Sequence, residues 1–128
     1  MILLDTHTWI WWLGETGQLS EAAARAIEQA ERVLISTIST WELALLVRRG
    51  RLRLSMPAES WVATTATVPK VRFAPPDNAI MLESVALPEA LHKDPADRIL
   101  VATARLRRVP LVTRDAKLQA YPHVETVW

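Results

Sequence analysis

The chain has 128 residues, of which 50% are hydrophobic and 23% are charged, the balance of one ordinary globular domain with a buried core. Its formal net charge of +1 does not by itself indicate a nucleic-acid-binding protein, and the absence of cysteine excludes disulfides and thiolate zinc sites. The first residues contain no basic segment, and no apolar stretch is long enough to cross a membrane, so we expect a cytoplasmic protein that does not bind membranes.

The chain begins with a short apolar run, Ile2–Leu4, that ends at an acid, Asp5. Residues 6–13 are again mostly apolar. A continuous apolar run of this length suits a strand that is buried on both faces.

The next segments alternate between helical and strand patterns. A helix is expected over residues 20–31, with Ser20 as the N-cap, and the mostly apolar segment at 33–36 predicts a second buried strand. A second helix is expected from Ser39 to Gly50. Residues 51–54 alternate basic and apolar side chains, which is typical of an exposed edge strand or an extended arm.

The second half of the chain continues this alternation. The predicted elements are a helix over 57–67, a strand over 71–73, a helix that begins after Asp77 and ends before Pro88, a helix over 95–108, a strand over 109–112, a short helix near 117–119 and a strand over 124–128. Such alternation predicts an α/β domain in which helices cover both faces of a parallel sheet.

Five acids are expected at one edge of this sheet. Asp5 directly follows the first strand, and Asp115 follows the strand that ends at residue 112. Glu42, Asp94 and Asp97 lie in the first turns of predicted helices. In such folds helix N-termini and strand carboxyl ends meet at the edge where ligands bind, so the sequence predicts that these carboxylates gather there.

Each acid also has a structural interpretation. Ser39 and Glu42 have the spacing of a capping box, while Asp94 and Asp115 are placed to cap the helices that follow them. Asp5 is harder to explain in this way, because it ends a strand. The alternative to a catalytic site is therefore a non-catalytic RNA- or protein-binding module whose acids cap helices.

Convergence of the acids favours a metal site. Two unit charges about 4 Å apart repel by roughly 4 kcal/mol at an effective dielectric constant of 20, so several carboxylates in one place require a cation. Mg²⁺ or Mn²⁺ suits an all-oxygen set, and the chemistry implied is phosphodiester hydrolysis. Thr6 and Thr113 could orient these ligands, while His7 and His92 are expected to be hydrogen-bond partners rather than general bases.

Four segments in register carry a family resemblance: Leu3–His7, Ser36–Glu42, Asp94–Ala104 and Thr113–Asp115. The chain resembles PIN-domain proteins, in particular the toxin ribonucleases of VapBC-type toxin–antitoxin pairs. The resemblance spans residues 1–128 as a single PIN domain. It implies a three-layer α/β/α fold with a central, mostly parallel sheet.

The resemblance also implies a Mg²⁺-dependent endoribonuclease. Asp5, Glu42, Asp97 and Asp115 would form its acidic quartet, with Asp5 and Asp97 as the firmest metal ligands. Glu42 and Asp115 would complete the site through a second ion or bound waters. Asp94 is then better interpreted as a helix cap.

The implied partners are an RNA substrate, a second copy in a homodimer, and a cognate VapB-type antitoxin that inhibits the toxin by covering its site. Arg48 and Arg49 belong to the densest basic run, with Arg51 and Arg53, and are candidate RNA contacts. Arg105, Arg107 and Arg108 form a second basic run, which is expected to lie too far from Asp97 to contact the substrate. Trp9, Trp11, Trp12 and Trp41 are predicted to pack in the core or to line a groove for the antitoxin.

A receiver-like phosphoacceptor domain would share the fold class and the Mg²⁺ site. It requires adjacent acids after the first strand and an aspartate after the third. Asp5 stands alone and residues 71–74 end without an acid, so the residue placement excludes a receiver.

Overall fold

The computed structural model describes residues 1–14 and 17–128 and contains one five-stranded sheet in which all paired strands run parallel. Its strand order is β3-β2-β1-β4-β5. The strands are β1 (Ile2–Leu4), β2 (Val33–Ser36), β3 (Val71–Ala74), β4 (Leu111–Val112) and β5 (Thr126–Val127). The helices of the described residues are α1 (Thr6–Leu13), α2 (Glu21–Gln29), α3 (Thr37–Arg48), α4 (Ala58–Ala66), α5 (Asn78–Ala86), α6 (Pro95–Arg107) and α7 (Ala116–Ala120).

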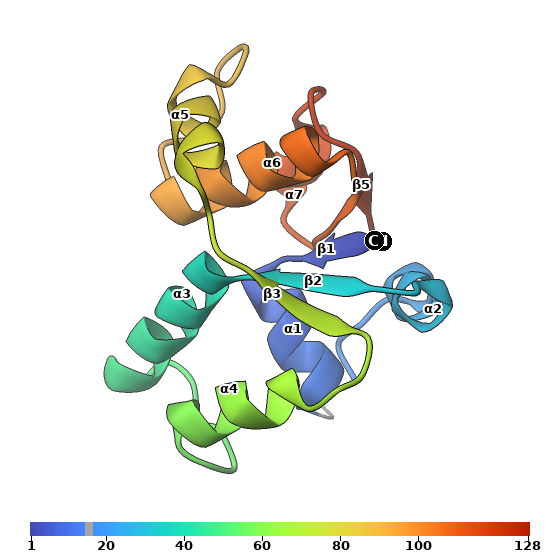
Figure 1. The fold of residues 1–128 in the computed structure, drawn as a ribbon, viewed down its shortest axis with the longest axis vertical. Coiled ribbons are helices and arrows are strands. Elements are labelled where there is room, and N and C mark those ends of the chain that lie inside the picture. The colour runs from blue at the N-terminus through green and yellow to red at the C-terminus, as the bar shows by residue number, and fades with distance from the viewer. Residues whose placement is uncertain (15–16) are drawn as a thin grey trace.

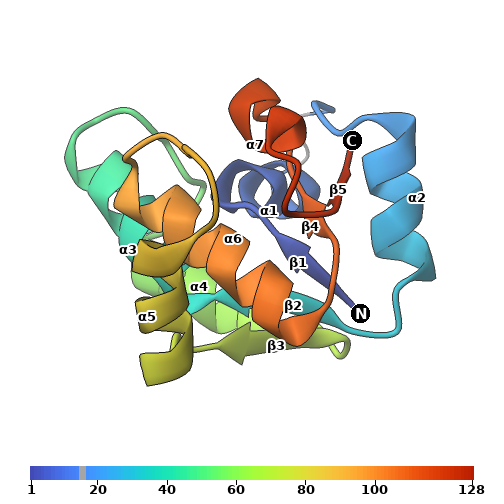
Figure 2. The same cartoon turned by 90° about the horizontal axis from the view of Figure 1, so that it is seen from above.

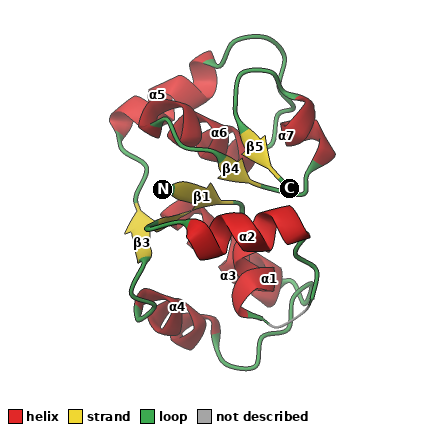
Figure 3. Ribbon diagram, turned by 90° about the vertical axis from the view of Figure 1, so that its right-hand side faces the viewer, coloured by secondary structure: helices red, strands yellow, loops and turns green. Residues whose placement is uncertain are grey.

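Helices cover both faces of the sheet. In Figure 1, α5, α6 and α7 lie above the strands and α1, α3 and α4 lie below them, and Figure 3 shows the same separation from the side. Alternate residues of β1 serve the two sides, since Leu3 packs with α6 in one core cluster, while Ile2 and Leu4 pack with α1 in the other. The prediction of a three-layer α/β/α domain is confirmed.

Helix α6 is the most deeply buried helix and lies directly against the sheet (Figure 2). Every residue from Ile99 to Ala104 is buried. Asp94 caps its N-terminus by accepting a hydrogen bond from the Asp97 backbone N–H at 3.0 Å, as predicted. Asp97 is therefore held in the first turn of a buried helix.

The apolar run at residues 6–13 is a helix, so its prediction as part of a buried strand is wrong. The strand stops at Leu4 because Asp5 caps α1, with its carboxylate accepting from the Thr6 backbone N–H at 2.6 Å. Trp9 and Ile10 of α1 are buried. Aromatic and β-branched residues are common in strands, which is why this buried helix has the sequence pattern of a strand.

The N-cap of helix α3 lies three residues before the predicted one, Ser39. Ser36 caps it, since its hydroxyl accepts from the Ile38 backbone N–H at 3.2 Å. The predicted capping box of Ser39 and Glu42 is therefore wrong, and Glu42 lies in the second turn. Gly50 follows the helix with φ +69°, as expected for a residue just past a helix end.

Residues 51–54 form no strand in the described sheet, whose edges are β3 and β5. Leu52 and Leu54 instead pack against the core below the sheet, so the prediction of an exposed edge strand is wrong. The other predicted elements are confirmed, with shifts at their ends. Among the described helices, none has the length and apolar character needed to cross a lipid bilayer.

Burial of α6 predicts a large loss of stability when its core is truncated. Leu100→Ala should lower the free energy of unfolding by about 2–5 kcal/mol, because Leu100 is fully buried and a cavity would remain. Leu106→Ala is the matched control in the same helix; Leu106 is 47% exposed, and its truncation should cost less than about 1 kcal/mol. Urea unfolding of both variants measures the difference, and equal losses would contradict the described core.

Candidate active site

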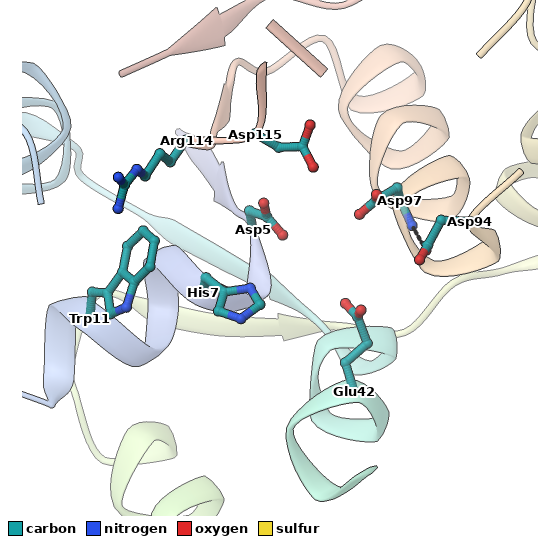
Figure 4. Close-up of a pocket in the computed structure, with 8 residues that line it drawn as sticks. All are labelled: Asp5, His7, Trp11, Glu42, Asp94, Asp97, Arg114 and Asp115. Atoms are coloured by element: carbon teal, nitrogen blue, oxygen red, sulfur yellow. Dashed lines mark hydrogen bonds between the residues drawn. The ribbon is translucent and has the colours of Figure 1, made fainter. Parts of the chain in front are cut away.

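The site lies where the strand order reverses. From β1 the sheet extends through β2 in one direction and through β4 in the other, and the carboxyl ends of such strands open a crevice. A hollow of about 490 Å³ occupies this position. Its lining residues, which Figure 4 shows, are Asp5, His7, Trp11, Glu42, Asp94, Asp97, Arg114 and Asp115. The prediction that the five acids gather at one edge is confirmed.

Asp5 lies at the floor of the hollow and is only 8% exposed. Its backbone N–H donates to the Val112 carbonyl, which fixes it beside β4. Its second carboxylate oxygen accepts from the Thr113 hydroxyl at 2.7 Å. Burial raises the pKa of Asp5 above its usual range, and the hydrogen bonds from Thr113 and Thr6 oppose that rise.

Glu42 reaches the hollow from α3. Its carboxylate lies 2.5 Å from the Thr6 hydroxyl oxygen, which is itself 2.8 Å from the Ser39 hydroxyl oxygen. Because Thr6 has one hydroxyl proton, it donates to Glu42 and accepts from Ser39. Burial raises the pKa of Glu42 to about 7, the Thr6 hydrogen bond opposes the rise, and the nearby Asp5 and Asp97 charges add to it.

Asp97 faces the hollow from α6, with its side chain 17% exposed. His92 Nε2 lies 2.6 Å from its carboxylate, which confirms that His92 is a hydrogen-bond partner. Burial raises the pKa of Asp97 to about 6, the His92 hydrogen bond lowers it, and the Asp5 charge raises it further. His7 makes a different contact, with its ring packed against Trp11 at a centroid distance of 5.7 Å.

Asp94 and Asp115 are helix caps that also line the hollow. Asp115 accepts from the backbone N–H groups of Lys117 and Leu118 at 2.8 and 3.2 Å, both on one carboxylate oxygen. Its own backbone N–H donates to the Thr113 hydroxyl at 3.1 Å, and Thr113 in turn donates to Asp5. Thr113 therefore connects the two acids that follow β1 and β4.

The side chains fit a hard divalent cation by their chemistry. The acids offer carboxylate oxygens alone, three of them are buried enough to raise their pKa values, and no lysine or arginine pairs with them in residues 1–14 and 17–128. No three acidic or histidine side chains in the described residues are grouped closely enough to form a complete metal cage. The acids line one hollow, but in the described residues they are not already arranged as a complete set of metal ligands.

A smaller groove of about 230 Å³ adjoins the acids, and Trp41, Leu45, Leu46 and Arg49 contribute to its lining. Trp41 is exposed there, whereas Trp9 is fully buried in the core. Of the two arginines predicted to contact RNA, Arg49 borders this groove and Arg48 does not line either hollow.

One pair of site residues was not predicted. The guanidinium carbon of Arg114 lies 5.8 Å from the ring centroid of Trp11, on the side of the hollow away from Asp97 (Figure 4). The available signal was the position of Arg114 between Thr113 and Asp115, two residues already assigned to the site. Trp11 was expected only in the core or an antitoxin groove.

Known proteins are similar to this chain in sequence and in fold. Residues 2–124 match the PIN domain family. Ribonuclease VapC22 from Mycobacterium tuberculosis (strain ATCC 25618 / H37Rv) is 39% identical over 129 residues, which cover 99% of this chain and 98% of that protein.

Solved structures share the fold at lower identity. A toxin–antitoxin complex from Klebsiella pneumoniae contains a chain with a TM-score of 0.68 and 22% identity, covering 97% of this chain and 95% of that one. VapBC2 from Rickettsia felis, bound to a DNA fragment from its promoter, gives a TM-score of 0.71 at 15% identity, covering 98% and 97%. The chain therefore belongs to the PIN-domain family, among the VapC-type ribonucleases.

Proposed function

We propose that this chain is a Mg²⁺-dependent endoribonuclease toxin that hydrolyses RNA phosphodiester bonds in its acidic hollow. The observation that carries the proposal is that Asp5, Glu42, Asp97 and Asp115 line one hollow in a VapC-type ribonuclease. The family implies a divalent cation in general. Mg²⁺, with Mn²⁺ as a substitute, is the proposed ion because the ligands are all oxygen atoms.

In this proposal Asp5 and Asp97 hold the ion, while Glu42 and Asp115 complete the site through water or a second ion. Once bound, the cation supplies positive charge that balances the carboxylates and stabilises the charge that develops on the phosphate. Thr113 holds one oxygen of Asp5 in place, and Thr6 does the same for Glu42. The oxygen of a water molecule bonds to phosphorus as that water gives up one proton, the bond to the leaving ribose oxygen breaks, and the leaving oxygen takes up one proton.

The alternative of a non-catalytic module with structural acids accounts for only part of the site. Asp5, Asp94 and Asp115 do cap helices. Glu42 and Asp97 cap no helix among the described residues, and both hold raised pKa values at an energetic cost to the fold. Capping therefore leaves unexplained the two acids that face Asp5 across the hollow, and a metal-dependent site accounts for them.

The proposed partners follow from the family. We propose an RNA substrate that Arg49 contacts beside the acids, with Arg48 as a second contact outside the groove. We also propose a cognate VapB-type antitoxin whose apolar segment occupies the groove lined by Trp41 and Leu45. Sequencing RNA ends after pulsed expression, with Asp5→Ala as the control, would identify the RNA and the bond that is cut.

Replacing one carboxylate tests the catalytic proposal. Asp97→Asn should reduce Mg²⁺-dependent RNA cleavage by roughly 100-fold or more, because it removes a charged metal ligand and leaves the size of the side chain unchanged. Asp94→Asn is the matched control three residues away, because asparagine caps a helix about as well as aspartate. Its cleavage rate should stay within a few-fold of wild type.

Cleavage is measured on total RNA with and without EDTA, and melting temperatures confirm that both variants fold. Undiminished cleavage by folded Asp97→Asn, or equal losses in the two variants, would contradict the assignment of Asp97.

The raised pKa values predict how stability depends on pH without metal. In the folded protein the pKa of Glu42 is raised from 4.5 to about 7, and that of Asp97 is raised from 3.8 to about 6. Both carboxyl groups therefore keep their protons to a higher pH in the folded protein than in the unfolded chain. Their stabilising contribution is therefore present at low pH and is lost as the pH rises through about 4 to 7. Glu42→Gln removes one of these groups, so its melting temperature relative to wild type should increase between pH 5 and pH 8.

Mg²⁺ should reverse this loss in the wild-type protein at pH 8 by neutralising the carboxylates, and Asp5→Asn should weaken the stabilisation by Mg²⁺. Parallel melting curves of wild type and Glu42→Gln across this pH range would contradict the electrostatic account.

We also propose that the protein is a homodimer, as the family resemblance implies. Three exposed apolar side chains on α5 supply a surface that a second copy could cover: Met81, Leu82 and Val85 are 45%, 73% and 81% exposed. Leu82→Glu should shift the mass measured by light scattering from dimer to monomer. Leu106→Glu, on the exposed face of α6, is the control, and a monomeric wild type or a dimeric Leu82→Glu would argue against this surface.

A further inference from the structure

The hollow has two unlike sides. Figure 4 shows Asp97, Asp94 and Glu42 on one side, and Arg114 above Trp11 on the other. Of its eight lining residues, five are acids and Arg114 is the one permanent cation. An RNA strand that enters the hollow therefore meets repulsion from the acids, and Arg114 is the lining side chain that attracts a phosphate at every physiological pH.

Trp11 is held in place as a wall of the hollow. Its ring packs against Trp128 at a centroid distance of 5.7 Å and against His7 at the same distance. The side chain is half-buried, so part of it is covered by these neighbours while part lines the hollow. Such a fixed ring loses little conformational freedom when a flat ligand stacks on it.

Arg114 is placed to act together with this ring. It is exposed in the segment between β4 and α7, with its guanidinium carbon 5.8 Å from the Trp11 ring centroid. Within residues 1–14 and 17–128 no carboxylate lies within ion-pair distance of it. Its donors are thus available to a ligand anion, although several acids lie in the same hollow.

An aromatic ring beside an arginine is the combination that single-stranded nucleic-acid binding uses, since a base stacks on the ring and the cation holds a phosphate. We infer that Trp11 and Arg114 form a nucleotide subsite next to the cleavage site, where one base of single-stranded RNA stacks on Trp11 and a neighbouring phosphate binds Arg114. This inference rests on the proposed function, because it assigns the substrate's position relative to the acids.

Two probes separate stacking from phosphate binding. One is a fluorescent single-stranded RNA of roughly ten nucleotides, and the other is an abasic oligomer of the same length. Both are titrated by fluorescence anisotropy against the Asp97→Asn protein, so that binding is measured independently of cleavage. Trp11→Leu in this background should weaken RNA binding roughly tenfold and leave abasic binding unchanged, while Trp11→Phe should retain most of the affinity for RNA.

Arg114→Gln should give the complementary pattern. It should weaken binding of both probes and reduce the slope of log affinity against log salt concentration by about 0.7, the value for one phosphate contact on a single strand. Trp12→Leu is the matched control, because Trp12 is the next residue of the same helix, is half-buried and does not line the hollow. Its affinity for both probes should equal that of the background protein.

Several outcomes would overturn the subsite. One is that Trp11→Leu weakens the binding of both probes equally, or of neither. Another is that Arg114→Gln leaves the slope of log affinity against log salt concentration unchanged. Loss of antitoxin binding alone, with RNA affinity intact, would assign the surface to a protein segment instead. Should Trp11→Leu fail to fold, Trp11→Phe carries the test, and equal effects on RNA and abasic probes would then contradict stacking. Cleavage that survives Asp97→Asn would contradict the proposed function. The comparison of RNA and abasic binding would still test the subsite by itself.

Discussion

Repulsion among buried carboxylates is the constraint on which the site depends. Asp5, Glu42 and Asp97 reach one hollow from the end of β1, from α3 and from α6, and burial raises the pKa of each. The charge of Asp5 raises the pKa values of Glu42 and Asp97 further. For scale, any two unit charges about 4 Å apart repel by roughly 4 kcal/mol at an effective dielectric constant of 20, and the repulsion falls with distance. A divalent cation would relieve this cost, so the binding of metal, the stability of the fold and the chemistry are linked in one place.

The scaffold holds these acids in place against their repulsion. Asp97 is anchored on a helix buried from Ile99 to Ala104. The guanidinium of the neighbouring Arg98 donates to the Ser84 carbonyl of α5 at 2.9 Å and to the Leu91 carbonyl, in the segment before α6, at 3.1 Å. Hydroxyl groups from Thr6 and Thr113 hold Glu42 and Asp5 in place. Ligands supported by packed helices and hydroxyls keep the positions that metal binding requires.

The sequence was sufficient for the architecture and the acidic set, because apolar periodicity and helix caps are local signals and parallel strands bring their carboxyl ends together. It failed where tertiary contacts override local pattern. The buried helix at 6–13 has the composition of a strand, and Ser39, which looked like a helix cap, instead bonds to Thr6 inside the site. The pairing of Arg114 with Trp11 joins residues about a hundred positions apart, and no periodicity encodes such a contact.

The proposed catalysis requires a divalent cation bound between Asp5 and Asp97, and this is the central claim. The most direct measurement is the anomalous difference map of crystals grown with Mn²⁺. We expect a strong peak in the hollow, with carboxylate oxygens of both residues within about 2.5 Å of it, and its loss in Asp97→Asn crystals. A map without a peak in the hollow, or with a peak that persists unchanged in the variant, would contradict the claim.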